Sequence, residues 1–174
     1  MKRQSGFTLV ELLVVISIIT IIIALVVPNI GAYRQNARKS VAAANIQSIS
    51  MALDNYKNDY RSYPTVSGSS DYYISLNNAM YKALTGDVDG NFSIDQSEGA
   101  KATYLQIDAV NLYVDSTGQK QPYLADPWTN RYGYWPGPTY FNRTRFNLWS
   151  LGPDGATGTG SGLGDATDDI NNWR

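Results

Sequence analysis

Residues 1–30 read MKRQSGFTLVELLVVISIITIIIALVVPNI and contain the longest apolar run of the chain. Phe7 to Val27 is a run of 21 residues made almost entirely of Leu, Ile and Val. At about 1.5 Å per residue, a helix of this length crosses a hydrocarbon core roughly 30 Å thick. Lys2 and Arg3 precede the run without any acidic residue. The positive-inside rule therefore predicts a cytoplasmic N-terminus and an exported C-terminal part.

Glu11 places a carboxylate inside this apolar run. Burying an unpaired carboxylate in a bilayer costs about 2.5 kcal/mol or more, so the side chain needs a partner. One interpretation puts Glu11 near the headgroups at the helix start, where the helix dipole favours negative charge. A second interpretation depends on the whole string of residues around it.

The string Gly6-Phe7-Thr8-Leu9-Val10-Glu11-Leu12, after a short basic leader, resembles the class III signal of type IV pilins and type II secretion pseudopilins. The resemblance implies that a prepilin peptidase cleaves between Gly6 and Phe7 and that the new amine is methylated. It also implies that this amine neutralises Glu11 of a neighbouring subunit and sets the register of a filament. A secretory signal peptide would instead be cleaved beyond its apolar run, where we find no convincing A-x-A site.

The composition limits the chemistry that this chain can perform. It has no His and no Cys, which excludes imidazole catalysis, disulfides, thiolate nucleophiles and Cys-based zinc sites. The net charge of -1 excludes the basic surface of a nucleic-acid-binding protein. About 147 residues follow Val27, enough for one domain. An exported domain without disulfides often needs another stabilising crosslink, and a bound metal ion is the usual substitute.

The helix is expected to continue past Pro28 with a kink and to end at Tyr63-Pro64-Thr65. The same Tyr-Pro-Thr follows the long helix in the major pseudopilins that this chain resembles. Apolar residues recur at steps of three to five residues and predict a stripe that packs on the domain, with its half from Val41 to Tyr60 in the core. The stripe consists of Ala37, Ala42, Ile46, Ile49, Leu53, Tyr56 and Tyr60. Residues 72–84 predict a second, shorter helix.

Residues 87–98 follow this second helix and space oxygen-bearing side chains as an EF-hand calcium loop does. The candidate ligands are Asp87, Asp89, Asn91, Ser93, Asp95 and Glu98, at loop positions 1, 3, 5, 7, 9 and 12. Phe92 stands where the sharp turn normally has Gly, and a bulky residue is strained at positive φ. The loop is expected either to bend differently or to bind calcium weakly. The alternative is a polar surface turn that holds no metal.

The segment DPWTNRY (126–132) resembles the Asp-Pro-Trp-Gly-Asn-Pro-Tyr motif of major pseudopilins, with Thr129 and Arg131 in place of Gly and Pro. We interpret the segment as structural. Asp126 is expected to cap a turn while the aromatic residues bury against the helix.

Short runs around this motif predict strands. Residues 132–135 and 146–150 are expected to pair as a hairpin. Residues 102–107 and 111–114 favour a strand or a loop, with Tyr104 packed inward beside Leu105.

The last stretch resembles the C-terminal calcium loop of major pseudopilins: LWSLGPDG (148–155), a glycine-rich span, then DDINNW (168–173). The ligands implied are the Leu151 carbonyl and the side chains of Asp154, Asp168 and Asp169, with Thr157 and Asp165 as weaker candidates. Glycines let the backbone curl back, and without a cation the carboxylates would repel one another. The alternative is a disordered glycine tail, against which Trp173 at the far end favours docking.

We therefore expect a pilin-like α+β fold: a long N-terminal helix on a small C-terminal antiparallel sheet, with calcium-organised loops. The expected divisions are a leader peptide (1–6), the transmembrane part of the helix (7–28), its extramembrane part (29–63) and a periplasmic globular domain (64–174). The expected location is the bacterial inner membrane, single-pass N-in/C-out, and then a periplasmic filament.

The function implied by the resemblance is structural, as a subunit of a pseudopilus that drives type II protein secretion. The implied partners are further copies of the chain, minor pseudopilins, an inner-membrane assembly platform and the prepilin peptidase, with Ca²⁺ as cofactor. No catalytic residue and no nucleic acid are expected. The alternative is a major or minor type IV pilin for adhesion, motility or DNA uptake. The absence of Cys favours the pseudopilin, since a surface pilin more often closes its C-terminal loop with Cys.

Overall fold

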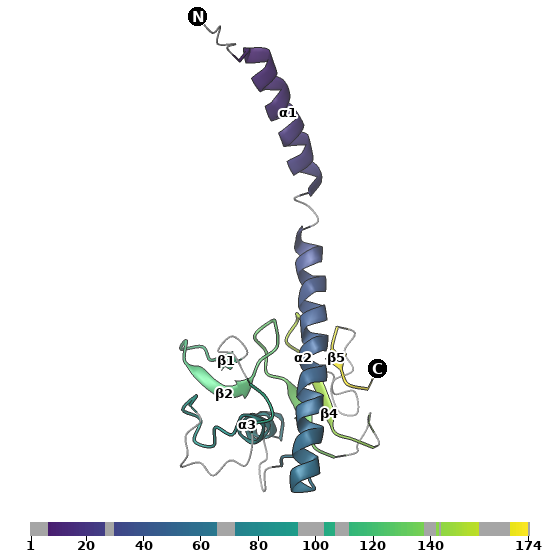
Figure 1. The fold of residues 1–174 in the computed structure, drawn as a ribbon, viewed down its shortest axis with the longest axis vertical. Coiled ribbons are helices and arrows are strands. Elements are labelled where there is room, and N and C mark those ends of the chain that lie inside the picture. The colour runs from purple at the N-terminus through teal and green to yellow at the C-terminus, as the bar shows by residue number, and fades with distance from the viewer. Residues whose placement is uncertain are drawn as a thin grey trace, which may run out of the picture. The chain divides into compact units, whose positions relative to one another are not determined.

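The computed structural model describes residues 7–26, 30–65, 72–93, 103–106, 112–137, 142, 144–156 and 168–173. The chain divides into two compact units, Met1–Ala37 and Arg38–Arg174. The helices are α1 (Leu9–Val26), α2 (Ile30–Tyr60) and α3 (Tyr72–Thr85). The strands are β1 (Leu112–Val114), β2 (Lys120–Leu124), β3 (Gly133–Trp135), β4 (Asn147–Ser150) and β5 (Ile170–Asn171). Figure 1 labels these elements.

The long N-terminal helix predicted from the sequence is present as α1 and α2 on either side of residues 27–29. The expected kink at Pro28 falls outside the described residues. Helix α2 ends at Tyr60, and Arg61 follows with a positive φ of 64°, which breaks the helical path. The helix thus ends three residues before Tyr63, where the sequence placed its end, because Arg61 leaves the helical conformation before Pro64 is reached.

The apolar stripe of α2 is buried only along the second unit. Ala42, Ile46, Ile49 and Leu53 are at most 4% exposed, as predicted. The core prediction for Val41 to Tyr60 was wrong for its last member, and the first residue of the stripe, ahead of that range, is also exposed. Ala37 precedes the second unit and is exposed, and Tyr60 is 36% exposed at the end of the helix, where it stacks on Tyr56 at 4.3 Å.

The strands form two small antiparallel sheets in the second unit. β1 pairs with β2, and β4 lies between β3 and β5. The β3–β4 pairing, with Tyr134 opposite Leu148, confirms the predicted hairpin. Neither β2 nor the pairing of β5 with β4 was predicted from the sequence.

Helix α3 joins the two sheets through a buried asparagine. The Asn77 side-chain amide donates to the carbonyls of Tyr132 at 2.7 Å and Leu124 at 3.3 Å, and its oxygen accepts the Leu124 N–H at 2.8 Å. Figure 1 shows α3 beside the β1–β2 pair. Residues 103–106 lie alongside α3, since the amides of Tyr104 and Leu105 donate to the Leu84 carbonyl. Both side chains pack on the core, as expected.

Candidate assembly helix and metal-binding loops

Helix α1 begins with a reciprocal pair of side chains, Thr8 and Glu11. One Glu11 carboxylate oxygen accepts the Thr8 N–H at 2.8 Å and the Thr8 hydroxyl at 2.7 Å, and the Glu11 N–H donates to that hydroxyl at 3.2 Å. This is a capping box, which satisfies backbone donors that the first turn of a helix leaves without partners. Glu11 therefore has a partner within its own chain.

Sequence reasoning gave Thr8 no role, although Thr-x-x-Glu before an apolar run is the pattern of a capping box. Gly6 lies outside the described residues, and Phe7, the first described residue, is 78% exposed. Cleavage between them, and pairing of Glu11 with the amine of a neighbouring subunit, both stay predictions.

The described side chains of α1 are exposed on every side. Its large apolar side chains from Leu9 to Ile23 are between 46% and 80% exposed. The hydroxyls of Ser17 and Thr20 donate to backbone carbonyls one turn earlier, at 2.8 and 2.7 Å. A helix that is apolar on every side normally buries its surface against lipid or other helices. In the part of the chain that the structure describes, no helix meets the length and hydropathy of a membrane span.

The EF-like loop is described over positions 87–93, while Asp95 and Glu98 lie outside the described residues. Phe92 has a φ of 67°, the left-handed conformation that EF-hand loops reserve for Gly. The loop therefore turns at the expected position in spite of the bulky side chain. Holding a non-glycine residue in this conformation costs of order 1–3 kcal/mol.

Asp87 lies at the centre of this turn and is 1% exposed. Its carboxylate accepts the Tyr81 hydroxyl at 2.6 Å and the backbone N–H groups of Gly90, Asn91 and Phe92 at 2.7, 3.2 and 3.0 Å. Burial opposes ionisation of this carboxyl, but the four hydrogen bonds outweigh it and lower its pKa. The described half of the loop is therefore organised around an ionised Asp87.

The two ends of the C-terminal segment meet at β4. Strand β5 pairs with β4, and the Leu148 N–H donates to the Asn172 side chain at 3.0 Å. The rings of Trp149 and Trp173 meet edge to face with centroids 6.1 Å apart. The docking expected from Trp173 is therefore present in the structure.

Asp168 is the predicted ligand that lies against the other end of the loop. A Cβ on Gly152, whose φ is 69°, would lie 2.8 Å from the Asp168 carbonyl oxygen and 2.9 Å from its Oδ2. Asp169 is 7% exposed, whereas Asp154 is exposed and accepts the Ala156 N–H at 2.9 Å.

Thr157 and Asp165 lie outside the described residues. Among the residues that are described, no group of three acidic side chains is placed to hold a metal. The closure of the segment is thus observed, while its calcium ligation stays a prediction.

The Asp-Pro-Trp turn is tied to the end of β4 through Asp126. One carboxylate oxygen accepts the N–H groups of Trp128 at 3.0 Å and Asn130 at 2.8 Å, which confirms the predicted cap. The other accepts the Ser150 hydroxyl at 2.6 Å. Burial raises the pKa of Asp126 in spite of these hydrogen bonds.

The same turn also supports the start of the C-terminal loop. The Asn130 side chain donates to the Gly152 carbonyl at 2.8 Å, and a Cβ on Gly155 would lie 3.0 Å from its Oδ1. Thr129 has a φ of 72°, which explains why the family motif has Gly at this position. Sequence reasoning missed this link, because the two motifs are about twenty residues apart.

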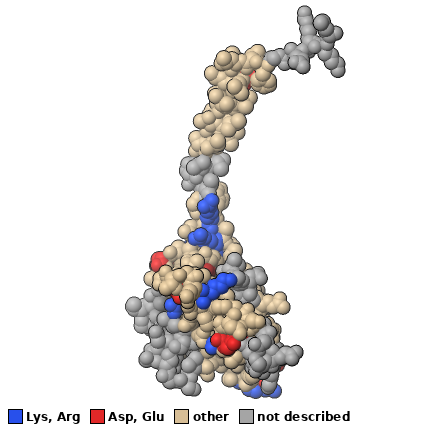
Figure 2. All heavy atoms as spheres, turned by 90° about the vertical axis from the view of Figure 1, so that its left-hand side faces the viewer, with Lys and Arg blue, Asp and Glu red and all other residues tan. Residues whose placement is uncertain are grey.

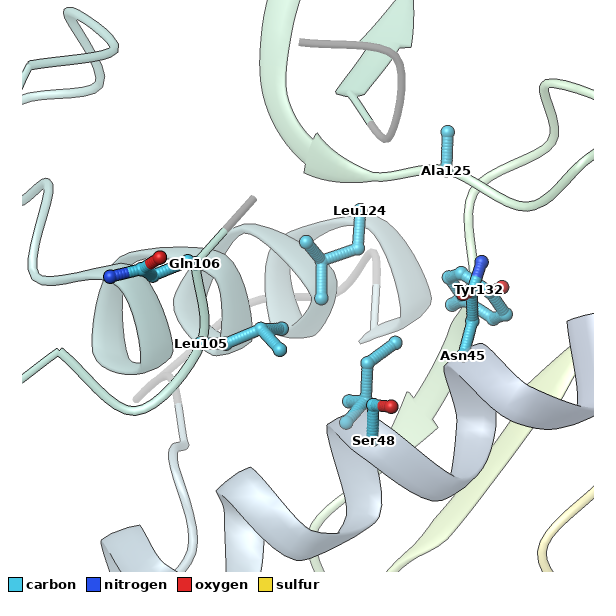
Figure 3. Close-up of a pocket in the computed structure, with 8 residues that line it drawn as sticks. Asn45, Ser48, Leu105, Gln106, Leu124, Ala125 and Tyr132 are labelled. Atoms are coloured by element: carbon cyan, nitrogen blue, oxygen red, sulfur yellow. The ribbon is translucent and has the colours of Figure 1, made fainter. Parts of the chain in front are cut away.

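A cavity of about 40 Å³ lies between α2 and residues 103–106. Figure 3 shows its polar lining, which comprises Asn45, Ser48, Gln106 and Tyr132. Burial raises the pKa of the Tyr132 hydroxyl well above its usual range. The cavity is large enough for a water molecule and far smaller than the usual site for a small-molecule ligand.

Comparison with known proteins gives matches at both ends of the chain and along its whole length. The family described as "Prokaryotic N-terminal methylation motif" matches residues 1–27, and "Type II secretion system (T2SS), protein G" matches residues 97–173. The type II secretion system core protein G of Pseudomonas aeruginosa is 35% identical over 99% of this chain and 96% of its own length. The chain belongs to the type II secretion system core protein G family.

Other members of the core protein G family match at similar levels. The Escherichia coli protein is 32% identical over 98% of this chain and 92% of its own length. The Vibrio cholerae protein is 30% identical over 100% of this chain and 94% of its own length. A solved structure of the major pseudopilin from the type 2 secretion system of enterohaemorrhagic Escherichia coli is 22% identical, covering 85% of this chain and 96% of that one, with a TM-score of 0.42. The family predicted from the sequence is confirmed by the core protein G relatives.

Proposed function

We propose that this chain is the structural subunit of a periplasmic pseudopilus that drives type II protein secretion. The observation that carries the proposal is α1, whose apolar side chains are exposed on every side in a chain of the core protein G family. A surface of this kind is stable only where lipid or other helices cover it. A filament subunit stored in a membrane meets both environments in turn.

The proposed sequence of events begins in the inner membrane. Residues 7–28 cross the bilayer with the N-terminus in the cytoplasm, and the prepilin peptidase cleaves between Gly6 and Phe7. The amine that this releases is methylated and retains its positive charge. The proposed partners are further copies of the chain, minor pseudopilins and the inner-membrane assembly platform.

Glu11 has two alternative partners in this scheme: Thr8 of its own subunit and the N-terminal amine of a neighbouring subunit. In the single subunit, Thr8 satisfies the carboxylate with neutral donors. In the filament, the cationic amine of a neighbouring subunit would replace them. The hydrogen bonds from Thr8 already have a charged acceptor, and the cationic amine adds an ion-pair attraction that is strong in the low-dielectric environment of packed helices, so the exchange favours assembly.

Glu11→Ala tests this proposal directly. The variant is expected to be inserted and cleaved like the wild type but to give few filaments when the secretion machinery is overproduced. Ser17→Ala is the matched control, because the Ser17 hydroxyl bonds only its own helix among the described contacts. The measurements are N-terminal sequencing of the cellular protein and filament yield by electron microscopy. Wild-type filament yield from Glu11→Ala would contradict the proposal.

We also propose that Ca²⁺ closes the C-terminal loop, held by the Leu151 carbonyl and the side chains of Asp154, Asp168 and Asp169. The contact of Asp168 with Gly152 supports this, since it brings hard oxygen ligands to the start of the loop. The cation would supply only charge and coordination. EGTA is expected to make residues 152–173 protease-sensitive in the wild type, and unchanged cleavage would count against the site.

A second calcium site is proposed at residues 87–98, where Asp87 is already ionised and buried. Calcium should raise the melting temperature of the chain, and Asp87→Ala with Glu98→Ala should remove part of that rise. The same calcium response in the double variant would assign the loop to a metal-free turn.

A further inference from the structure

The first turns of α2 carry an exposed basic segment, defined here as residues 33–39. Residues 28–53 include three cations, Arg34, Arg38 and Lys39, and no acidic residue. All three cations are exposed, and Tyr33 beside them is 72% exposed. Arg34 and Arg38 are four residues apart and share one face of the helix. Figure 2 shows blue atoms and no red ones on this exposed part of the chain.

We propose that the basic segment binds the phosphate groups of anionic phospholipids at the periplasmic surface of the inner membrane. The inference rests on the membrane anchoring proposed above, which would hold this part of α2 close to that surface. It adds a second, electrostatic attachment to the hydrophobic one.

Chain length places the basic segment within reach of the phosphates. Arg34 lies eight residues beyond Val26, the last residue of α1, and Lys39 lies thirteen residues beyond it. At a helical rise of about 1.5 Å per residue these separations are about 12 and 20 Å, and the headgroup layer is several ångströms thick on each side of the hydrocarbon core. Side chains on a helix tilt toward its N-terminus, and Arg and Lys extend their charged ends along their long stems. Arg34 can therefore reach the headgroups directly, and Arg38 and Lys39 lie within roughly one Debye length, about 8–10 Å, of them.

The residue types also fit a lipid surface. Tyr is enriched at the boundary between hydrocarbon and water, where its ring and hydroxyl meet different environments. Each Lys or Arg near an anionic membrane surface raises the affinity of a protein for that surface roughly fivefold. Because no acidic residue lies within residues 28–53, no neighbouring negative charge along this stretch weakens the attraction between the three cations and the membrane.

The acidic side chains further along the same helix have other partners, which disfavours a second copy of the chain as the occupant. Asp54 pairs with Arg145 and accepts the Tyr63 hydroxyl at 3.1 Å. Asp59 accepts the Tyr104 hydroxyl at 2.6 Å. A second copy that neutralised the basic segment with these carboxylates would disturb their contacts, whereas lipid phosphates require no such change.

The test uses the full chain, which has no Cys, so Ala37→Cys provides a single site for a fluorophore beside the cations. The labelled chain is reconstituted in nanodiscs that contain a tracer lipid with a nitroxide near its headgroup. The tracer is either phosphatidylglycerol or phosphatidylcholine at equal amounts. We expect the anionic tracer to be enriched about fivefold or more around the label, as measured by fluorescence quenching, and the enrichment to fall at high salt.

Two variants with the same change in net charge separate the basic segment from a general charge effect. Arg34→Gln with Arg38→Gln and Lys39→Gln should lose the enrichment. Lys57→Gln with Lys82→Gln and Lys120→Gln, which leave the basic segment intact, should keep it.

Equal quenching by the two tracers, or an unchanged enrichment in the first variant, would overturn the proposal. Self-quenching between labels in place of quenching by lipid would identify a second copy as the occupant and also overturn it. Loss of the labelled chain from nanodiscs of both compositions would instead refute the membrane anchoring itself, so the two failures are distinguishable.

Discussion

Helix α1 and the second half of α2 are both rich in apolar residues, but only α2 buries them within the chain. The large apolar side chains of α1 from Leu9 to Ile23 are 46% exposed or more, whereas Ile46, Ile49 and Leu53 of α2 are at most 4% exposed. In α2 the apolar residues form one stripe beside a polar face, and in α1 they occupy every face. The difference teaches that a stripe predicts a partner in the same chain, while an all-round apolar surface predicts a partner outside it.

The largest expected effect on the free energy of unfolding comes from truncating an Ile side chain to Ala, which we compare between α2 and α1. Ile49→Ala should lower the free energy of unfolding by about 2–5 kcal/mol, because it opens a cavity in the core. Ile19→Ala, at a side chain that is 49% exposed, should change it by less than about 0.5 kcal/mol. Denaturation in detergent, followed by the fluorescence of the four Trp residues, measures both. Equal losses would break the comparison.

A smaller effect is expected where the second unit closes on itself. Gly152→Ala places a Cβ 2.8 Å from the Asp168 carbonyl oxygen at a φ of 69°, and should cost about 1–3 kcal/mol. Gly118→Ala is the matched control, since its φ is 82° but no atom lies within 4 Å of the added Cβ. Melting temperatures separate the clash from the backbone strain. A loss in Gly118→Ala as large as in Gly152→Ala would show that the contact with Asp168 is unimportant.

The loss of stability in acid should show how much the ionised Asp87 contributes to the stability of the second unit. Its folded pKa is lowered, while an unfolded Asp titrates near pH 3.9. Its stabilisation is therefore present in full above about pH 4 and is lost as the pH falls through the lower folded pKa. Asp87→Asn should flatten the decline of melting temperature below about pH 4 in calcium-free buffer, and the exposed neighbour variant Asp89→Asn should not. An unchanged acid profile would contradict this role.

The smallest effect on the second unit is expected from the capping box of α1. Thr8→Ala should weaken the first turn of α1 by about 1 kcal/mol and leave the unfolding of residues 38–174 unchanged. Amide hydrogen exchange in detergent measures both regions at once. Faster exchange in the second unit would mean that the two regions are coupled, against the comparison.

The sequence predicted the features of this fold that depend on local patterns. The ends of α2 and α3, the β3–β4 hairpin and the cap by Asp126 follow from periodicity, Pro and Gly positions, and turn chemistry. The β5–β4 pairing and the contact of Asn130 with Gly152 join distant segments, so no local pattern signals them.

In the candidate sites too, some features follow from local sequence patterns and others depend on contacts between distant segments. The capping box of Thr8 with Glu11 follows from the local pattern Thr-x-x-Glu before an apolar run, although it was not predicted. The positive φ of Phe92 was foreseen as a difficulty, and the structure accommodates it. The ligand sets of the two loops extend into residues outside the described ranges. The closeness of Asp168 to Gly152 was implied by the resemblance to the calcium loop of major pseudopilins, because a glycine-rich span has no local pattern that fixes which residues meet.

Crosslinking between copies along α1 tests the central claim most directly. The chain has no Cys, so single substitutions at positions 14–23 can be oxidised in cells that overproduce the secretion machinery. We expect ladders of multiple subunits at successive positions around the helix, and we expect them to be lost in Glu11→Ala. Monomers alone at every position, with filaments present, would contradict it.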